Sequence, residues 1–340
     1  MTLRIGLIGA GGNTKLRHIP GFQAIDGVEV VAVCNRTAAS AQAVADEFNI
    51  PRVVENANDI INADDIDAVC VGTWPNMHHD LAIATLNAGK HILTEARMAM
   101  NLLEAREMLA MSEASDKVAM IVPSPFYLKY EPTILDMLSD GFFGDILEVH
   151  VTALAGGYNP DAPLQWRQRR DLSGNNIMSM GIQNEAVRRY VGHEKSVMAH
   201  GKIFTTERLD AETSNVTAAD VPESLGIIAE LQTGGTAVYH VSTVAHLGSN
   251  AMEFYGTKAA FKYEGGKAFI ATNADQSWQP LEVAQGKEGG WRVEQEFVDA
   301  ILTGSPITHT NFADGVKYME FTEAVQISIR EARRVDLPIA

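Results

Sequence analysis

Hydrophobic positions follow two different patterns along the chain, and the change falls near residue 123. Before it, short continuous apolar runs alternate with longer segments of helical period, which is typical of βαβ units. Because the apolar runs are continuous, both faces of their sheet should be covered, which predicts a parallel, doubly wound sheet. Strands are expected at Leu3 to Ile8, Val28 to Cys34, Ala68 to Gly72, His91 to Thr94 and Val118 to Val122, with helices near 15–25, 38–48, 77–88 and 101–115.

After Pro123 and Pro125, a helix is expected near 130–140, followed by segments in which apolar and polar residues alternate. Alternation predicts a large, mostly antiparallel sheet with one open face. The fold class is therefore α/β, with one domain over residues 1–123 and a second over 124–340. An apolar open face should lie against another subunit, so we expect a homodimer or homotetramer. The alternating segments are Ile146 to Leu154, Ser224 to Gln232, Thr236 to Val244 and Ala251 to Tyr255.

Charge and composition narrow the expected partners. The chain has 43 acidic and 27 basic residues, a net charge of -16, so nucleic acid and anionic membranes are poor partners. No apolar run is long enough for a membrane span, and the chain starts directly in a strand-like segment without a signal peptide pattern. Cys34 and Cys70 lie in apolar runs and have no neighbouring ligands. We expect buried thiols, no bound metal and a cytoplasmic location.

The strongest local motif is Gly9-Ala10-Gly11-Gly12-Asn13-Thr14, between the first strand and the first helix. Glycine lets the backbone turn tightly and approach a pyrophosphate, whose charge the helix N-terminus stabilises. In this position the motif predicts a Rossmann domain that binds a nicotinamide dinucleotide. The alternative is a tight turn only, and Thr14 in place of the last glycine weakens the match.

The end of the second strand bears on the choice of cofactor. NAD enzymes usually carry an acid there, which accepts hydrogen bonds from the ribose hydroxyls, but this chain has Asn35 and Arg36. Asn35 would not repel a 2′-phosphate, and Arg36 could pair with it. NADP is therefore preferred over NAD, unless Arg36 is an ordinary solvated charge.

The segment from Ile66 to His78, continued by Ala88 to Glu95, closely resembles the glucose-fructose oxidoreductase / inositol dehydrogenase / rhizopine catabolism (Gfo/Idh/MocA) family. The stretch from Gly174 to Gly192 and the turn Gly256-Thr257-Lys258 extend the resemblance over nearly the whole chain. It implies a Rossmann domain, a second α/β domain, and a substrate held between them. It also implies that the nicotinamide side is lined by Thr73, Trp74, Asn76 and His78, and that Glu95 contacts the nicotinamide ribose. Arg97 is expected to be a further cofactor-binding residue.

The catalytic signatures of that family are altered in this chain. Its Glu-Lys-Pro signature aligns with Glu95-Ala96-Arg97, so the catalytic lysine is replaced by Ala96. Its Asp, followed four residues later by His, aligns with Ser179 and Gln183. Hydride removal from a carbinol requires that the hydroxyl proton leave too, and Gln183 can orient a hydroxyl without accepting its proton.

Three interpretations of the altered site remain open. In the first, Tyr127 or Lys129 handles the proton, since both align with site residues of the family; the alternative is a core tyrosine and a solvated lysine. In the second, the substrate is activated and needs little acid help. In the third, the site binds ligands without chemistry.

Residues that suit a polyhydroxylated or carboxylated small molecule gather before and around the altered second signature. Aromatic faces cover apolar ring hydrogens, while arginine and asparagine bind oxygens. We therefore expect an NAD(P)-dependent oxidoreductase acting on a sugar, cyclitol or related hydroxy or carbonyl compound, with a non-standard proton relay. The alternatives are a catalytically silent binding protein and NAD-assisted, elimination-type glycoside cleavage. The substrate candidates are Tyr158, Trp166, Arg167, Asn176, Ser179, Gln183 and His246, although His246 could be an ordinary sheet residue, and Arg169, Arg188 and Arg189 could be surface charges paired with carboxylates.

Overall fold

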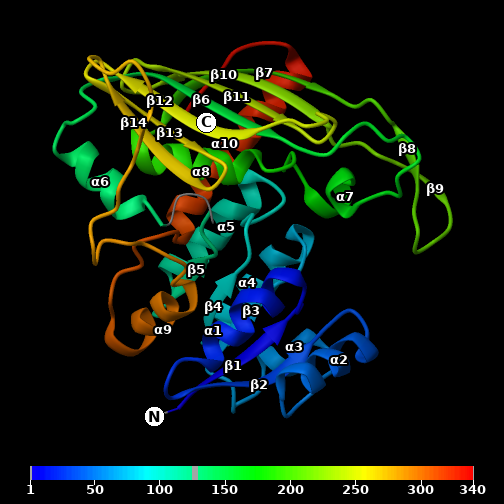
Figure 1. Ribbon diagram of the computed structural model, residues 1–340. Helices are drawn as coiled ribbons and strands as arrows, with labels where there is room; N and C mark the ends of the chain where they lie inside the picture. Colours follow the sequence, from blue (N-terminus) through cyan, green and yellow to red (C-terminus); the bar gives the residue numbers. More distant parts are fainter. Residues whose placement is uncertain (1, 125–128, 340) are drawn as a thin grey trace. The chain divides into compact units, whose positions relative to one another are not determined.

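The computed structural model describes residues 2–124 and 129–339 and divides into two compact units (Figure 1). The first unit contains Met1–Pro123 and Arg292–Met319, and the second contains Ser124–Trp291 and Glu320–Ala340. The sequence predicted a single domain boundary at 123/124. In the structure the chain leaves the first unit there, and residues 292–319 belong to the first unit again. The reason is apolar packing: Phe297 is wholly buried, with its ring centroid 6.3 Å from that of Phe22.

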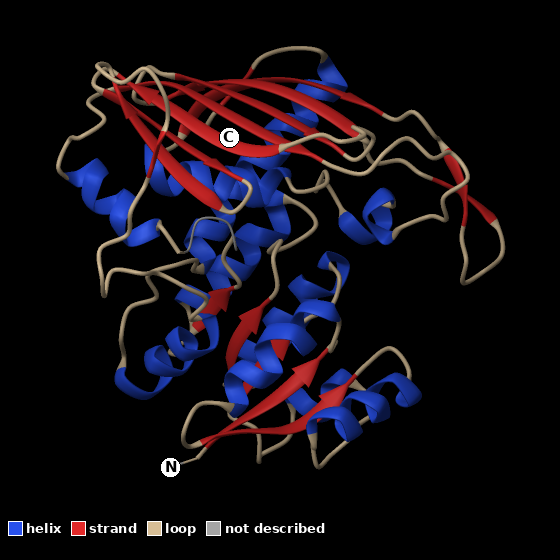
Figure 2. Cartoon of the chain, in the orientation of Figure 1, coloured by secondary structure: helices blue, strands red, loops and turns tan. Residues whose placement is uncertain are grey.

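The first unit is built on a five-stranded parallel sheet in the order β2-β1-β3-β4-β5, as the continuous apolar runs predicted (Figure 2). All four residues of β3 are buried. The strands are β1 (Leu3–Ile8), β2 (Val28–Cys34), β3 (Ala68–Val71), β4 (His91–Thr94) and β5 (Ala119–Ile121). The helices are η1 (Thr14–His18), α1 (Ile19–Gln23), α2 (Ala38–Phe48), α3 (Ala57–Ile61), α4 (Pro75–Asn87), α5 (Leu102–Glu113) and α9 (Val293–Thr303).

The helix expected near 15–25 differs from a regular α-helix. Residues 12 and 13 are α-helical, the π-helix η1 follows, in which the Ile19 N–H donates to the Thr14 carbonyl, and the short α1 continues the stretch. Pro20, near the start of α1, has no N–H to donate within the stretch.

The second unit contains a nine-stranded sheet in the order β15-β14-β13-β12-β6-β11-β10-β7-β16. Only β6 and β11 pair in parallel, so the predicted mostly antiparallel sheet is confirmed. The strands are β6 (Ile146–Leu154), β7 (Glu194–Lys202), β10 (Ser224–Leu231), β11 (Thr236–Ser242), β12 (Asn250–Gly256), β13 (Ala259–Glu264), β14 (Lys267–Thr272), β15 (Gln279–Pro280) and β16 (Val335–Asp336).

The remaining elements of the second unit comprise helices and a separate hairpin, β8 (Glu207–Leu209) with β9 (Val216–Ala218). The helices are η2 (Trp166–Gln168), α6 (Glu131–Ser139), α7 (Arg170–Ser173), α8 (Met180–Val191) and α10 (Phe312–Glu331), whose first residues belong to the first unit. Residues of α6, α8 and α10 share one hydrophobic core with the buried face of the large sheet.

The opposite face of that sheet carries an exposed apolar row. Met198 on β7, Ile228 on β10 and Val238 on β11 are in register, and they are 57%, 61% and 40% exposed. The alternating burial along these strands matches the pattern from which an open face was predicted. Within the described residues, no helix combines the length and apolarity needed to cross a bilayer.

Candidate functional site

The glycine-rich loop after β1 turns tightly against the loop after β3. Gly9 has a φ of 85°, and its N–H donates to the Cys34 carbonyl at 2.8 Å. A Cβ on Gly9 would lie 2.6 Å from Cγ2 of Thr73, and one on Gly72 would lie 2.3 Å from the Gly9 carbonyl oxygen. Glycine is therefore required at both positions for the two loops to approach.

The side of this loop away from the sheet suits a pyrophosphate. Residues 12–23 form a continuous helical stretch, and the first N–H groups of a helix lack intrahelical acceptors. A Cβ on Gly12 would have no atom within 4 Å, so the space beside the first turn is open. The residues present fit a dinucleotide phosphate at this position.

Asn35 and Arg36, at the end of β2, lie beside the same loop. Oδ1 of Asn35 accepts a hydrogen bond from the Ala10 N–H at 2.6 Å, so this side chain also anchors the glycine turn. The Arg36 guanidinium is exposed and lies 5.4 Å from the ring centroid of Trp74. The structure thus brings the predicted cofactor residues of three strand ends together.

A buried network surrounds Glu95, at the end of β4. Oε1 of Glu95 accepts a hydrogen bond from Nδ2 of Asn13 at 2.5 Å and lies 3.0 Å from Nε2 of His18. Nδ1 of His18 lies 2.5 Å from Oε1 of Glu294, the second residue of α9. Burial alone would raise the pKa of Glu95, but the hydrogen bond and charge of His18 outweigh it and hold that pKa below its usual value.

His18 and Glu294 were not predicted as site residues. A histidine within a helical pattern does not reveal its partner, and Glu294 is 276 positions away. Burial would lower the pKa of His18, but hydrogen bonds to Glu294 and Glu95 raise it to about 9. Neither His18 nor Glu294 belongs to a sequence motif that would have indicated a site.

His78, predicted to line the nicotinamide side, is wholly buried. Its Nδ1 lies 2.9 Å from the Arg97 carbonyl and its Nε2 lies 3.1 Å from the Thr73 carbonyl. Burial lowers its pKa, which favours the neutral ring, and a neutral imidazole has one N–H to donate. The ring therefore donates to one of these two backbone carbonyls and lies close to the other. Arg97 is also buried and follows a cis Ala96–Arg97 peptide, whereas Asn76 is exposed on the first turn of α4.

In the second unit, three predicted substrate residues gather at the start of α8. Ser179 immediately precedes the helix, and the Gln183 N–H donates to the Ser179 carbonyl at 3.0 Å. The Gln183 side chain is buried. Asn176 is buried too, and its Nδ2 donates to the Ser173 carbonyl at 2.7 Å. The altered second signature therefore lies at the start of α8.

Of the other substrate candidates, Tyr158 and His246 lie on loops of the second unit, and Trp166 and Arg167 lie in the short helix η2. Tyr158 is 59% exposed, and the Arg167 guanidinium lies 4.2 Å from the Trp166 ring centroid. A Cβ on Gly157 would lie 3.6 Å from Nδ1 of His246, so His246 is near the Tyr158 loop.

A buried ion pair anchors the loop that carries Tyr158. Nη2 of Arg208 lies 2.7 Å from Oε1 of Glu223, and both side chains are buried. Nη1 of Arg208 donates to the carbonyls of Asn159 at 2.8 Å and Ala162 at 3.0 Å. The other Glu223 oxygen accepts the N–H groups of residues 204 and 205. The Arg208–Glu223 pair thereby fixes both the Tyr158 loop and the loop at residues 204–205.

Of the two residues predicted to carry the proton, the structure describes only Lys129. Tyr127 lies outside the described residues. Lys129 is exposed, with Nζ 5.2 Å from the ring centroid of Tyr130. Arg169 pairs with Asp171 and Arg189 with Glu131, each at 2.6 Å, which matches the alternative that these arginines are paired charges.

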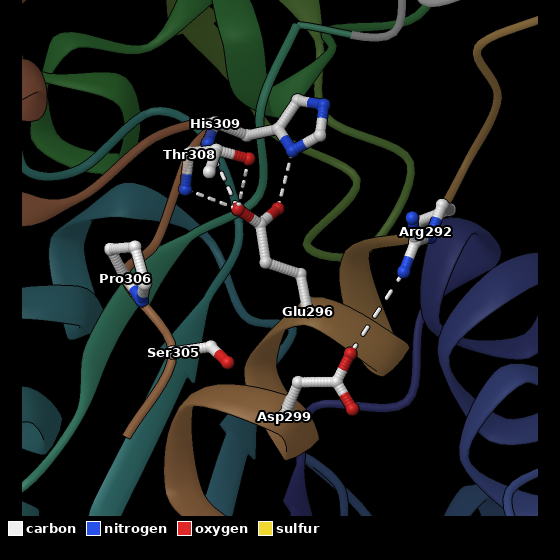
Figure 3. Close-up of a pocket in the computed structure, with 7 residues that line it drawn as sticks. All are labelled: Arg292, Glu296, Asp299, Ser305, Pro306, Thr308 and His309. Carbon is white, nitrogen blue, oxygen red and sulfur yellow. Dashed lines mark hydrogen bonds and ion pairs between the residues drawn. The ribbon is translucent and has the colours of Figure 1, made fainter. Parts of the chain in front are cut away.

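A small pocket in the first unit lies between α9 and residues 305–309 (Figure 3). The hydrogen bonds of this pocket centre on the Glu296 carboxylate. Its Oε1 accepts hydrogen bonds from the N–H and Oγ1 of Thr308 and from the N–H of His309, while its Oε2 contacts the His309 ring. Burial raises the pKa of Glu296, but these bonds dominate and lower it to about 2. The carboxylate clamps the loop. Across the described residues, no cluster of metal-ligating side chains is found.

The parallel sheet and the glycine turn at its carboxyl edge define a nicotinamide-dependent oxidoreductase with a Rossmann domain. Residues 3–122 match the model described as "Oxidoreductase family, NAD-binding Rossmann fold". Residues 133–262 match the model of the GFO/IDH/MocA C-terminal domain. The chain belongs to the Gfo/Idh/MocA family, and the resemblance inferred from its motifs is confirmed.

Individual relatives are more distant. The chain is 24% identical over 265 residues to the uncharacterized oxidoreductase sll0816 of Synechocystis sp., covering 76% of this chain and 70% of that protein. It is 30% identical over 154 residues to a glycosyl hydrolase family 109 protein of Shewanella baltica, covering 43% of this chain and only 33% of that protein. Levoglucosan dehydrogenase in complex with NADH and levoglucosan shares the fold, with 21% identity, a TM-score of 0.87 and 100% of both chains covered.

Proposed function

We propose that the chain is an NADP-preferring dehydrogenase or reductase that transfers a hydride between nicotinamide and a sugar, cyclitol or related small hydroxy or carbonyl compound. The observation that carries this proposal is the convergence of the glycine turn, Asn35 and Glu95 at the carboxyl edge of the parallel sheet. The solved levoglucosan dehydrogenase with the same fold supports the hydroxylated class of substrate.

The preference for NADP rests on the groups that Asn35 and Arg36 offer. Oδ1 of Asn35 already accepts the Ala10 N–H, so its remaining amide hydrogens suit an acceptor such as a phosphate oxygen. The exposed Arg36 guanidinium on the Trp74 face adds a positive charge at the same strand end. Neither group favours the ribose hydroxyls of NAD in the way a carboxylate does.

Proton transfer is the part of the reaction that the altered signatures leave to other residues. Bound nicotinamide would supply the hydride acceptor or donor, so the chain must hold the substrate oxygen and handle its proton. Ala96 cannot titrate, and Glu95 is held as a carboxylate by His18 and Asn13. We assign proton transfer to Lys129 or Tyr127, with Gln183 orienting the substrate hydroxyl.

The test is a substrate panel with NADP and NAD, read by the absorbance of the reduced cofactor. We expect turnover with NADP, and a loss of about 100-fold in kcat for Lys129→Met if Lys129 carries the proton. Ala96→Lys is the complementary variant, which should raise alcohol oxidation if the pocket is otherwise competent. Binding of cofactor without turnover of any substrate would instead support a silent binding protein.

A second function is favoured by the Shewanella relative. Its similarity to this chain supports NAD-assisted glycoside cleavage, in which the cofactor is regenerated. Release of the aglycone from a chromogenic glycoside, without net change in cofactor absorbance, would support this function and contradict the dehydrogenase proposal.

We also propose a cytoplasmic homo-oligomer that associates through the open sheet face. The in-register exposed row of Met198, Ile228 and Val238 supports this interface, because contiguous exposed apolar surface favours association. Cys34 and Cys70 are buried and free, which supports a reducing compartment. Light scattering that gives a monomer at micromolar concentration would contradict the oligomer.

A further inference from the structure

A chain of buried polar contacts runs from α9 to the glycine-rich loop within the first unit. Oε1 of Glu294 contacts Nδ1 of His18 at 2.5 Å, and Nε2 of His18 contacts Oε1 of Glu95 at 3.0 Å. Nδ2 of Asn13, in the glycine-rich loop, reaches the same Glu95 oxygen at 2.5 Å. His18 is 0% exposed and Glu294 is 3% exposed, so water does not compete for the contact between them, whereas Asn13 and Glu95 are partly exposed.

The protonation state of His18 follows from this geometry. Each ring nitrogen faces a carboxylate oxygen, and a carboxylate only accepts hydrogen bonds, so both nitrogens must donate. The ring is therefore an imidazolium. Nδ2 of Asn13 and Nε2 of His18 lie 3.4 Å apart. Since both are donors, they do not bond each other but converge on Glu95.

The packing of α9 against α1 places Glu294 at this position. A Cβ on Gly21 would lie 2.8 Å from Cγ, Cδ and Oε2 of Glu294, so glycine leaves the space that the carboxylate occupies. The edge-to-face contact of Phe22 and Phe297 holds the same two helices together. The site of Glu294 is thus built by neighbours on both helices.

We propose that Glu294 is a positioning residue for dinucleotide binding, which holds His18 as an imidazolium so that His18 and Asn13 together fix Glu95 and the glycine-rich loop. This role rests on the proposed function, since it requires that the loop binds a dinucleotide. The segment 292–319 thereby contributes to the cofactor site of the first unit without touching the cofactor.

Loss of the Glu294 charge should make dinucleotide affinity depend on pH in the neutral range. With both carboxylates present, the raised pKa of His18, about 9, keeps the ring charged below that pH, and affinity is lost only as pH rises through 9. In Glu294→Gln the ring loses one anionic partner, so its pKa falls and the loss begins at lower pH. For a variant pKa lowered by about two, we expect roughly 25-fold weaker binding at pH 8.5 relative to wild type, and only about twofold weaker binding at pH 7.

The experiment combines two measurements on the full chain. Affinity for NADPH and NADH is titrated by fluorescence from pH 7 to 10, above the titration of the 2′-phosphate. The titration of His18 is followed by NMR on ¹⁵N-histidine-labelled protein without cofactor. Glu296→Gln is the matched control: it neutralises a glutamate two positions along α9 that contacts residues 308 and 309 and not His18. Glu294→Asp keeps the charge and should restore part of the wild-type pH profile.

The proposal is supported if the affinity profile of Glu294→Gln moves to lower pH together with the His18 titration, while Glu296→Gln keeps the wild-type profile. Equal weakening at every pH would reduce Glu294 to a structural residue and overturn the proposal, as would a wild-type His18 that titrates near 6.5. If Glu294→Gln does not fold, the wild-type protein decides, since its affinity must fall as His18 deprotonates. Wild-type protein that binds no dinucleotide would overturn the proposed function, and with it this role, whatever the NMR titration shows.

Discussion

Replacing Asn35 by Asp tests the cofactor preference at a single atom. The aspartate keeps the oxygen that accepts the Ala10 N–H at 2.6 Å, so the glycine turn should stay anchored. It adds a negative charge where a 2′-phosphate of about -1.5 to -2 would lie. At a separation of about 6 Å and an effective dielectric constant of about 40, the repulsion is about 2 kcal/mol, or roughly 30-fold in NADP affinity.

The assay is a fluorescence titration of NADPH and NADH with wild type, Asn35→Asp and Asn35→Ala. Asn35→Asp should lose about 30-fold in NADPH affinity and bind NADH at least as well as wild type, because the carboxylate accepts the ribose hydroxyls. Asn35→Ala removes the Ala10 hydrogen bond, which should weaken both cofactors, and also the amide hydrogens offered to the phosphate, so NADPH should lose more affinity than NADH. If Asn35→Asp weakens both alike, Asn35 only anchors the loop and the reasoning about NADP is refuted.

Two further predictions concern buried carboxylates and use urea unfolding as the measurement. Glu296 has a pKa of about 2 against an ordinary 4.5, so it contributes stability above pH 4.5 that is lost as pH falls toward 2. The free energy of unfolding of Glu296→Gln should therefore be about 1–3 kcal/mol lower than that of wild type at pH 7. If wild type and Glu296→Gln lose stability equally between pH 4.5 and 2, this prediction is contradicted. Burial raises the pKa of Glu194 to about 7, against the hydrogen bonds from Tyr239 and Asn184, so folding loses stability as pH rises from 4.5 to 7. Glu194→Gln should therefore gain about 1–3 kcal/mol at pH 8 relative to its effect at pH 4, and equal effects at both pH values would exclude a buried proton on Glu194.

The parallel sheet could be predicted because its evidence is local. Most strand positions are apolar, and β2 (Val28–Cys34), which is interrupted only by the exposed Glu29, was bounded correctly from that pattern. The glycine turn was predictable for the same reason, since its motif stands between one strand and the next helix. The first strand of the large sheet, β6 (Ile146–Leu154), was also bounded correctly from alternation.

Contacts between distant positions could not be predicted. Nothing near Glu294 indicates that it meets His18, and the return of residues 292–319 to the first unit depends on the same kind of contact. The motif around His78 did not reveal that its ring is buried between two backbone carbonyl groups, and its place beside the nicotinamide stays a prediction. Burial and partner identity are properties of the folded chain, and a motif specifies neither.

The Arg208–Glu223 pair also bears on how specificity can change. Arg208 holds the Tyr158 loop through the carbonyl oxygens of Asn159 and Ala162, which every amino acid provides. Side chains on this loop can therefore mutate without releasing the anchor. If Tyr158 contacts the substrate as we propose, randomising this position would change the substrate-binding surface while the backbone anchor stays in place.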